Sequence, residues 1–442
     1  MQPMTPADIA AERPHALPCG GTTPLLRARA RMEATGQWTG SQSMGRRFSM
    51  GCVALEITQR CNLDCTMCYL SEMSESVRDT PIEEIFRRID IILAHYGPHT
   101  DVQVTGGEPT LRPRAELVAI VRRIRDRGMR PALFTNGIRA TRELLAELGE
   151  AGLVDVAFHV DSTQRRAGLP TEAGLDAVRA EYIERARGLP LSVLFNTTVH
   201  AGNFDAIPGI VRFFVRHSDV VRLASFQLQA DTGRGVDRHR AAIITQASVG
   251  RQIEAGAGAP IAFDTPGVGH HACNRYAMTL VANGQVYDLF DDKARMTRLL
   301  AATRQLQFDR TSKRRTLAIL AGWLARHPIE TLRCTGWAAR KLWAMKTDLA
   351  ASGGRVNKLS FFIHNFMGAE ELDRERIDAC VFMVATADGP VSMCLHNARR
   401  DSFILQKLRV GDTLWDPLTG AGPDAKPPRR IPLKGRARQT IS

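Results

Sequence analysis

The feature that most limits how this chain can fold is the alternation of short apolar runs with amphipathic helical stretches. Six runs rich in β-branched residues occupy 53–58, 101–105, 131–135, 154–160, 191–199 and 220–229. Helical periodicity lies between them, most clearly over 81–96 and 113–128. Strands that alternate with helices form a parallel sheet with right-handed crossovers. Six such units fall short of a closed eight-fold barrel, so the pattern predicts an α/β fold with a partial (β/α)6 barrel.

The sequence predicts four regions along the chain, one of which is this barrel. We predict an N-terminal extension over 1–50, the barrel over 51–235, a C-terminal α+β auxiliary region over 236–411 and a loose basic tail over 412–442. The auxiliary region carries two hairpin signals, which are Asn283-Gly284 and Asp388-Gly389, each between runs rich in β-forming residues.

Composition narrows the class of protein. The formal net charge of +13 favours an anionic partner such as nucleic acid, a phosphate-bearing metabolite or an anionic membrane. The first residues lack the apolar core of a secretory signal, and no stretch is apolar enough to span a membrane. We therefore expect a cytoplasmic protein, soluble or peripheral on the inner face of a membrane.

The chain has nine cysteines, and in a reducing compartment crowded cysteines favour metal binding over disulfides.

Three of these cysteines, Cys61, Cys65 and Cys68, follow the first predicted strand with the spacing C-x3-C-x2-C. Three thiolates on one loop can ligate three irons of a four-iron cluster and leave the fourth iron open. A structural zinc site needs a fourth ligand, and the same loop offers no further Cys or His. A zinc site completed from elsewhere and ordinary buried cysteines remain the alternatives.

Other polar groups follow later strands. Gly106-Gly107-Glu108-Pro109 follows the second strand, and Thr135-Asn136-Gly137 follows the third. Because reactive groups of such folds lie at the carboxyl ends of strands, we expect these segments to meet the cysteines. Asn196 lies inside an apolar strand, where a buried amide requires partners. We interpret His159 as a core histidine that faces away from Asp161.

These motifs resemble those of the radical S-adenosylmethionine (SAM) superfamily over residues 50–230. The resemblance implies a [4Fe–4S] cluster on Cys61, Cys65 and Cys68, with SAM bound at the open iron. It also implies electron transfer from reduced ferredoxin or flavodoxin, and cleavage of SAM to a 5′-deoxyadenosyl radical. The residues implied to contact SAM are Gly106, Gly107, Glu108, Thr135, Asn136, Asp161 and Asn196, with the Glu108 carboxylate facing the methionine ammonium. The chain departs from many members in having Met67, not an aromatic residue, before the third cysteine.

The segment 363–397 resembles the C-terminal part of the tetraether lipid synthase group, which includes a branch described as pterin methyltransferases. This resemblance implies a hydrophobic, lipid-linked substrate and a second iron–sulfur cluster. A cysteine-rich N-terminal module of that group is missing here. The candidate ligands of the second cluster are Cys273, Cys380, Cys394 and Cys334, with His270, His271 and His396 as substitutes. Ordinary buried cysteines are the alternative.

The stretch 313–346 is helical in pattern, basic and tryptophan-bearing, which is typical of helices that lie on a membrane surface. We predict that its basic residues and two tryptophans contact lipid: Lys313, Arg314, Arg315, Arg326, Trp323 and Trp343. A pair of plain covering helices is the alternative.

The sequence therefore predicts a radical SAM enzyme that abstracts hydrogen from a lipid-linked substrate. A radical SAM methyltransferase or peptide-modifying enzyme with an auxiliary cluster is the alternative. A zinc-stabilised nucleic-acid-binding protein is disfavoured, because aromatic residues make up only 6% of the chain and no RNA-binding motif is present.

Overall fold

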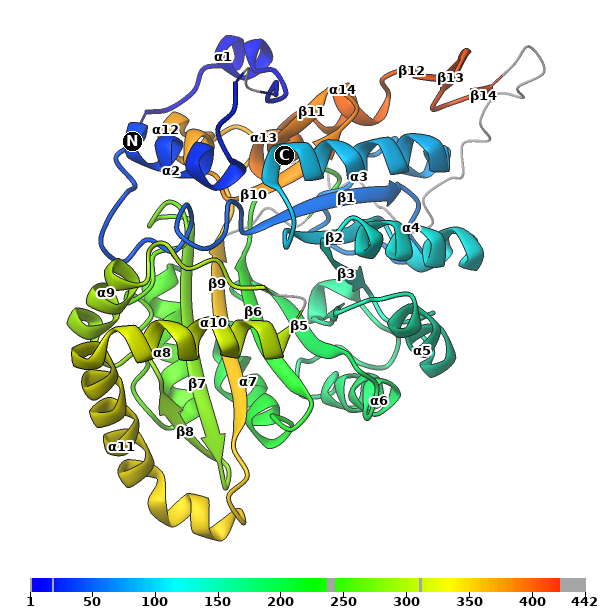
Figure 1. Cartoon of the computed structure of the whole chain (residues 1–442). Helices are drawn as coiled ribbons and strands as arrows, with labels where there is room; N and C mark the ends of the chain where they lie inside the picture. The colour runs from blue at the N-terminus through cyan, green and yellow to red at the C-terminus, as the bar shows by residue number, and fades with distance from the viewer. Residues whose placement is uncertain (1, 18–19, 237–242, 310–311, 422–442) are drawn as a thin grey trace.

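A computed structural model describes residues 2–17, 20–236, 243–309 and 312–421. Its centre is a curved eleven-stranded sheet with the order β11-β10-β1-β2-β3-β4-β5-β6-β9-β7-β8 (Figure 1). The six predicted strands are its parallel middle, and each pairs with the next. They are β1 (Cys52–Thr58), β2 (Asp101–Gly106), β3 (Arg130–Thr135), β4 (Asp155–His159), β5 (Ser192–Val199) and β6 (Val221–Leu228).

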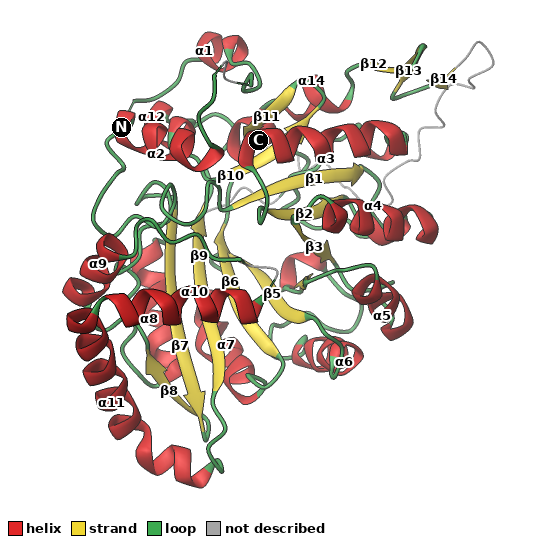
Figure 2. Cartoon of the chain, in the orientation of Figure 1, coloured by secondary structure: helices red, strands yellow, loops and turns green. Residues whose placement is uncertain are grey.

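Helices cover the outer face of this sheet (Figure 2). They are α3 (Ile82–Tyr96), α4 (Arg114–Asp126), α5 (Arg142–Glu150), α6 (Asp176–Ala186), α7 (Ile207–Arg216) and α8 (Gln246–Ala257). The prediction of an α/β partial barrel is confirmed.

The packing of α3 on β1 shows why these segments fold as they do. Val53, Leu55 and Ile57 alternate along the strand and are fully buried, as is the helical stripe Ile85, Ile89 and Ile92. The apolar face of the strand, with a period of two residues, thus packs against the apolar face of the helix. The alternate strand positions face the inner side of the curved sheet, and these are the positions that carry polar residues.

The C-terminal half extends the same sheet at both edges. The strand β9 (Asn357–Asn365) pairs in parallel with β6, and the hairpin of β7 (Asn274–Ala282) and β8 (Gln285–Asp288) follows beyond it. At the other edge, β10 (Phe382–Thr386) pairs in parallel with β1, and β11 (Gly389–Ser392) pairs with β10. The predicted auxiliary region therefore shares the central sheet with the barrel.

The two extended edges meet through aromatic side chains. The ring of Phe382 on β10 lies 5.8 Å from Phe362 and 4.9 Å from His364, both on β9, in edge-to-face geometry. No backbone pairing joins β9 to β10 in the described part of the sheet. Contacts between aromatic rings, and not pairing of strands, thus bring β9 and β10 together.

Both predicted hairpins form, with a shift in the second. In the first, Asn283 and Gly284 have φ of 51° and 76°, the left-handed pair that a two-residue hairpin turn requires. In the second, Thr386 pairs with Gly389, so the turn residues are Ala387 and Asp388.

The shorter elements surround this core. They are α1 (Pro6–Ala11), α2 (Pro24–Ala34), α9 (Lys293–Ala302), α12 (Arg374–Asp378), α13 (Met393–Ala398), α14 (Arg400–Ile404), η1 (Ser74–Ser76), η2 (Pro109–Leu111), η3 (Ser162–Gln164) and η4 (Phe204–Ala206). A separate small sheet contains β12 (Leu408–Val410), β13 (Thr413–Asp416) and β14 (Gly420–Ala421). The start of the predicted loose tail is therefore paired in strands, because Trp415 is buried beside Leu408. The rest, 422–442, lies outside the described residues.

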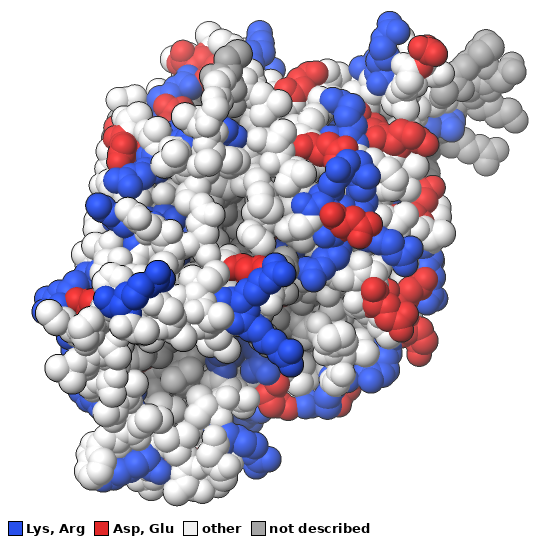
Figure 3. Space-filling model, viewed as in Figure 1, with Lys and Arg blue, Asp and Glu red and all other residues white. Residues whose placement is uncertain are grey.

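The predicted basic helices are α10 (Lys313–Arg326) and α11 (Pro328–Ala351). Trp323 is buried at 4% exposure and stacks on His327, so its predicted place on a membrane surface is wrong. Trp343 is 71% exposed, as that prediction requires. Much of the surface over α11 is uncharged (Figure 3). Within the described residues, no helix has the length and apolarity needed to span a bilayer.

Candidate functional site

The cysteine loop lies at the carboxyl end of β1 and is held by the loops that follow other strands. Asn62 accepts a hydrogen bond from Asn136 (2.7 Å), at the end of β3. The Thr66 amide donates to the carbonyl of Thr163 (2.9 Å), beyond β4. Tyr69 donates through its hydroxyl to the carbonyl of Gly106 (2.7 Å), at the end of β2. The structure thus brings the three predicted motifs together.

The glycines of the second motif are required by the backbone beside them. A Cβ on Gly106 would lie 2.0 Å from the Thr58 carbonyl oxygen, and one on Gly107 would lie 2.1 Å from that of Arg60. The two glycines therefore let the β2 exit pass against the β1 exit. Their predicted contact with SAM stays a prediction.

The Glu108 carboxylate joins these loops from inside. Its Oε1 accepts from the Thr110 amide (3.1 Å) and from the hydroxyls of Thr110 (2.6 Å) and Thr135 (2.7 Å). Its Oε2 accepts from the Asn136 amide (2.7 Å). Glu108 is fully buried, so the carboxylate that we predicted to face an ammonium group is occupied by four donors of the protein itself.

Polar residues in register cross the inner face of the sheet. His159 on β4 pairs with Asn196 on β5, which pairs with Ser225 on β6. The Ser225 hydroxyl is buried and has no hydrogen-bond partner among the described residues. Such unpartnered polar atoms favour a polar ligand, because burying them unsatisfied costs free energy. This face therefore fits the ribose and amino-acid groups of SAM, with Asn196 at the predicted position.

The relation of His159 to Asp161 corrects the sequence interpretation. Residues two apart on a strand share a face, so His159 does not face away from Asp161. Its Nε2 lies 2.7 Å from Oδ2 of Asp161, and 33% of its side chain is exposed. Asp161 also accepts from the amides of Thr163 (3.0 Å) and Thr198 (2.7 Å). His159 is thus partly exposed, and the Asp161 carboxylate fixes the orientation of its imidazole ring. It is not an ordinary core histidine.

The cysteines fit the predicted cluster by chemistry. Cys61, Cys65 and Cys68 form no disulfide and are partly exposed. Burial raises the pKa of Cys61 to about 12 and holds the pKa of Cys65 well above its ordinary value, and the charge of Cys68 raises both further. Cations beside them would favour the thiolate form that ligates iron. No three His, Cys, Asp or Glu side chains in the described ranges are already set at metal-binding geometry, so ligation requires their side chains to rotate.

Sequence reasoning missed a basic residue against this loop. Arg234 follows β6 in the segment Gly233-Arg234-Gly235, and its side chain is 1% exposed. The only sequence signal is an arginine between two glycines shortly after a strand. Its pKa is lowered by burial but raised more by Cys68 and Glu75, and lies above its ordinary value.

The auxiliary cysteines divide into two places. Cys273, Cys380 and Cys394 lie close together, since the charge of Cys380 raises the pKa of both Cys273 and Cys394. Cys273 accepts a hydrogen bond from Arg376 Nε (3.2 Å), and Cys394 accepts one from the Met367 amide (3.5 Å). Cys394 begins a helix, where we expected the end of a hairpin strand.

Cys334 lies apart from these three, on α11, where Glu330 and Arg295 are the charged groups that act on its pKa. The histidine substitutes are also placed. His270 stacks on His271 just before Cys273, and His396 lies beside Phe403.

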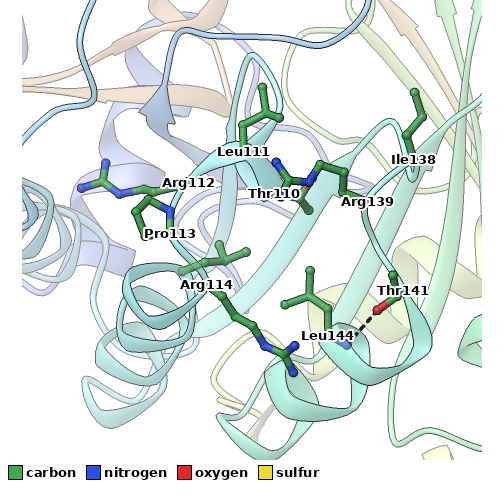
Figure 4. A pocket seen from close by; sticks show the side chains of 10 residues that line it. Thr110, Leu111, Arg112, Pro113, Arg114, Ile138, Arg139, Thr141 and Leu144 are labelled. Carbon is green, nitrogen blue, oxygen red and sulfur yellow. Dashed lines mark hydrogen bonds between the residues drawn. The ribbon is translucent and has the colours of Figure 1, made fainter.

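A cleft of about 520 Å³ lies beside the site, between η2 and the loop after β3 (Figure 4). Arg139 reaches across it toward Thr110. None of its lining residues belongs to the cysteine loop. We therefore place the candidate site on the inner face of the sheet and not in this cleft.

A sequence profile described as the radical SAM superfamily matches residues 55–214. Residues 55–214 form a radical SAM domain. This superfamily of enzymes uses a [4Fe–4S] cluster and SAM, and the predicted superfamily and its cofactors are confirmed for this domain.

Two curated relatives share part of the radical SAM domain. The chain is 31% identical over 186 residues to the 7,8-dihydro-6-hydroxymethylpterin dimethyltransferase of Methanocaldococcus jannaschii, covering 41% of this chain and 36% of the relative. It is 32% identical over 168 residues to the PqqA peptide cyclase of Bradyrhizobium diazoefficiens, covering 37% and 43%. The chain thus spans less than half the length of either relative.

A solved structure of SAM-bound SuiB from Streptococcus suis is also similar, with a TM-score of 0.37, 12% identity, and coverage of 52% of this chain and 49% of that one. A similarity of this size supports no argument about function.

Proposed function

We propose that this chain reductively cleaves SAM at a [4Fe–4S] cluster on Cys61, Cys65 and Cys68 and abstracts a hydrogen atom from an organic substrate. The observation that carries the proposal is the convergence of the three-thiol loop with the exits of β2, β3 and β4. When bound, the cofactors supply a 5′-deoxyadenosyl radical, which attacks C–H bonds that acid–base groups cannot. Reduced ferredoxin or flavodoxin is the proposed electron donor.

The residues of the chain then bind and orient. Glu108 and Tyr69 fix the position of the cysteine loop relative to β2 and β3. Asn196 and Ser225 offer hydrogen bonds to a polar ligand on the inner face. His159, oriented by Asp161, can hold or accept a proton at Nδ1, since its Nε2 faces the carboxylate.

For the substrate, the inner face favours a polar molecule. Against an aliphatic chain, the side-chain amide of Asn196 and the hydroxyl of Ser225 would stay unpaired, at a cost of about 1–3 kcal/mol each. The names of the two relatives, a pterin methyltransferase and a peptide cyclase, support the same direction. We therefore propose a pterin-like or peptide substrate.

A lipid-linked substrate is the second candidate, and the surface of α11 favours it. Ile329, Leu332, Leu342 and Trp343 are 58–75% exposed. Large exposed apolar side chains grouped on one helix are typical of a docking surface, and a basic protein would approach anionic lipid.

We also propose a second cluster on Cys273, Cys380 and Cys394. Their proximity and the N–H groups directed at two sulfurs support it, because hydrogen bonds to sulfur stabilise cluster thiolates. Cys334 has no part in this proposal, because it lies elsewhere.

The proposed activity is tested by anaerobic reconstitution of the chain with iron and sulfide. Reduced by dithionite, the parent is expected to convert SAM to 5′-deoxyadenosine. Cys65→Ala should lose this activity, because a cluster short of a ligand is labile, whereas Cys334→Ala should retain it. Equal product from parent and Cys65→Ala would contradict the cluster assignment.

A further inference from the structure

The cysteine loop has a fixed counter-charge. The guanidinium of Arg234 spans the loop, because Nη1 donates to Glu75 (2.8 Å) on one side and Nη2 to the Leu63 carbonyl (3.4 Å) on the other. Asp64 lies 4.0 Å from Nε. Nε itself is buried and forms no hydrogen bond within the described part of the chain. A buried guanidinium requires anionic neighbours, and the carboxylates of Asp64 and Glu75 lie within ion-pair distance of this one.

The backbone around Arg234 locks against the same loop. Three successive amides, of Arg234, Gly235 and Val236, donate to the carbonyls of residues 70, 68 and 66 at 2.7, 2.9 and 2.8 Å. Gly233 has φ of 58°, and a Cβ there would lie 2.3 Å from the Tyr69 backbone. Only glycine therefore fits at position 233, and the backbone of residues 233–236 packs directly against the cysteine loop.

The contacts of residues 234–236 span the loop that carries all three cysteines. The Arg234 side chain donates to the carbonyl of Leu63, which lies between Cys61 and Cys65. The Gly235 amide donates to the carbonyl of Cys68 at 2.9 Å. Bringing three thiolates together is costly without a cation, and the buried guanidinium of Arg234 is a cation that the fold places against their loop.

We propose that Arg234 is a positioning residue for the cluster: it fixes the loop of Cys61, Cys65 and Cys68 and places beside it a charge that favours the reduced state. The inference rests on the proposed function, because it concerns the same cluster. Reduction adds one negative charge, so a fixed positive charge raises the reduction potential, and removing it lowers the potential.

The experiment measures the midpoint potential of the reconstituted full-length protein by titration followed with electron paramagnetic resonance. Arg234→Gln should shift the potential to more negative values. Glu75→Gln should shift it to more positive values, because it leaves Arg234 uncompensated. Arg234→Lys keeps the positive charge but cannot bond to Glu75 and Leu63 at the same time. The midpoint potential of its cluster should therefore stay near that of the parent, while iron is lost faster. Arg130→Gln is the control, since Arg130 pairs with Asp101 (3.0 Å) at the amino ends of the strands.

Opposite shifts in Arg234→Gln and Glu75→Gln support the inference, whereas a merely structural role would change cluster content without opposite shifts. Unchanged potentials, or shifts of the same sign, overturn it. If Arg234→Gln holds no cluster, Glu75→Gln decides alone: a positive shift supports the inference and an unchanged potential overturns it. A parent that binds no cluster would instead overturn the proposed function.

Discussion

His159 and Asp161 form a direct pair on the inner face of β4, with Nε2 of the imidazole 2.7 Å from Oδ2 of the carboxylate. Burial lowers the pKa of His159, but the charge and hydrogen bond of Asp161 raise it above its ordinary 6.5. Burial raises the pKa of Asp161, but His159 and the donors on Thr163 and Thr198 hold it well below its usual range. Each partner thus stabilises the charged form of the other.

The first prediction is that Asp161→Asn lowers the pKa of His159, because burial and the charge of Arg166 then oppose only the charge of Glu172. Imidazole resonances of the cluster-free protein, followed by NMR against pH, measure this. His217 on α7 is the control, and its titration should not change. An unaltered His159 titration would show that Asp161 does not set its charge.

The same pair makes stability depend on pH. The contribution of His159 is complete below about 6.5 and is lost as pH rises through its raised folded pKa. The contribution of Asp161 is complete above about 4 and is lost as pH falls through its lowered pKa. The difference in unfolding free energy between parent and Asp161→Asn should therefore be largest between about pH 4 and 6.5. A difference independent of pH would contradict this linkage.

The second prediction concerns Glu108. The Gln amide in Glu108→Gln would place a donor among the four donors of Thr110, Thr135 and Asn136, so the unfolding free energy should fall by about 1–3 kcal/mol. Affinity for SAM should fall with it, because the loops lose their register. Thermal unfolding and equilibrium binding measured together check this. Weaker binding with unchanged stability would instead favour direct contact with the methionine ammonium.

The third prediction concerns the second cluster. The triple variant Cys61, Cys65, Cys68→Ala should still bind iron after anaerobic reconstitution. Adding Cys394→Ala should remove that iron, whereas adding Cys334→Ala should not, because Cys334 lies on α11. Iron and sulfide analysis of the three proteins provides the measurement. A triple variant that binds no iron would contradict the second cluster and indicate that the protein holds only one.

The fourth prediction tests the lipid-linked candidate. If α10 and α11 dock on a membrane, the protein should co-sediment with anionic vesicles at low salt and less at high salt. Anionic lipid contributes about 1 kcal/mol per basic residue, so changing Lys313, Arg314, Arg315 and Arg326 to Gln should weaken binding at least about tenfold.

Two tryptophans provide matched variants for this experiment. Trp343→Ala should weaken binding because the ring is exposed, whereas Trp323→Phe should not because that ring is buried. Vesicle binding that does not change with lipid charge, salt or the Trp343 substitution would contradict the proposed docking surface. The proposal of a polar substrate would then stand alone.

The sequence by itself determined the local elements and the chemistry of the loop. Period-two and helical apolar patterns fix strands such as β1 and helices such as α3, because burial of an amphipathic face depends mainly on neighbours close along the chain. The spacing of Cys61, Cys65 and Cys68 predicts the cluster for the same reason, since all three ligands lie on one loop.

Only the tertiary structure decided which distant groups meet. Arg234 reaches the cysteine loop because the segment that follows β6 is hydrogen-bonded to the loop that follows β1, and no sequence period records that proximity. Glu108 is occupied by donors from the exit of β3, and Cys334 is separated from Cys273 by its place on α11. Trp323 and Trp343 are the same residue type on two consecutive basic helices, yet one is buried and the other exposed. Their difference arises because burial depends on how helices pack in space, which residue type and spacing alone do not specify.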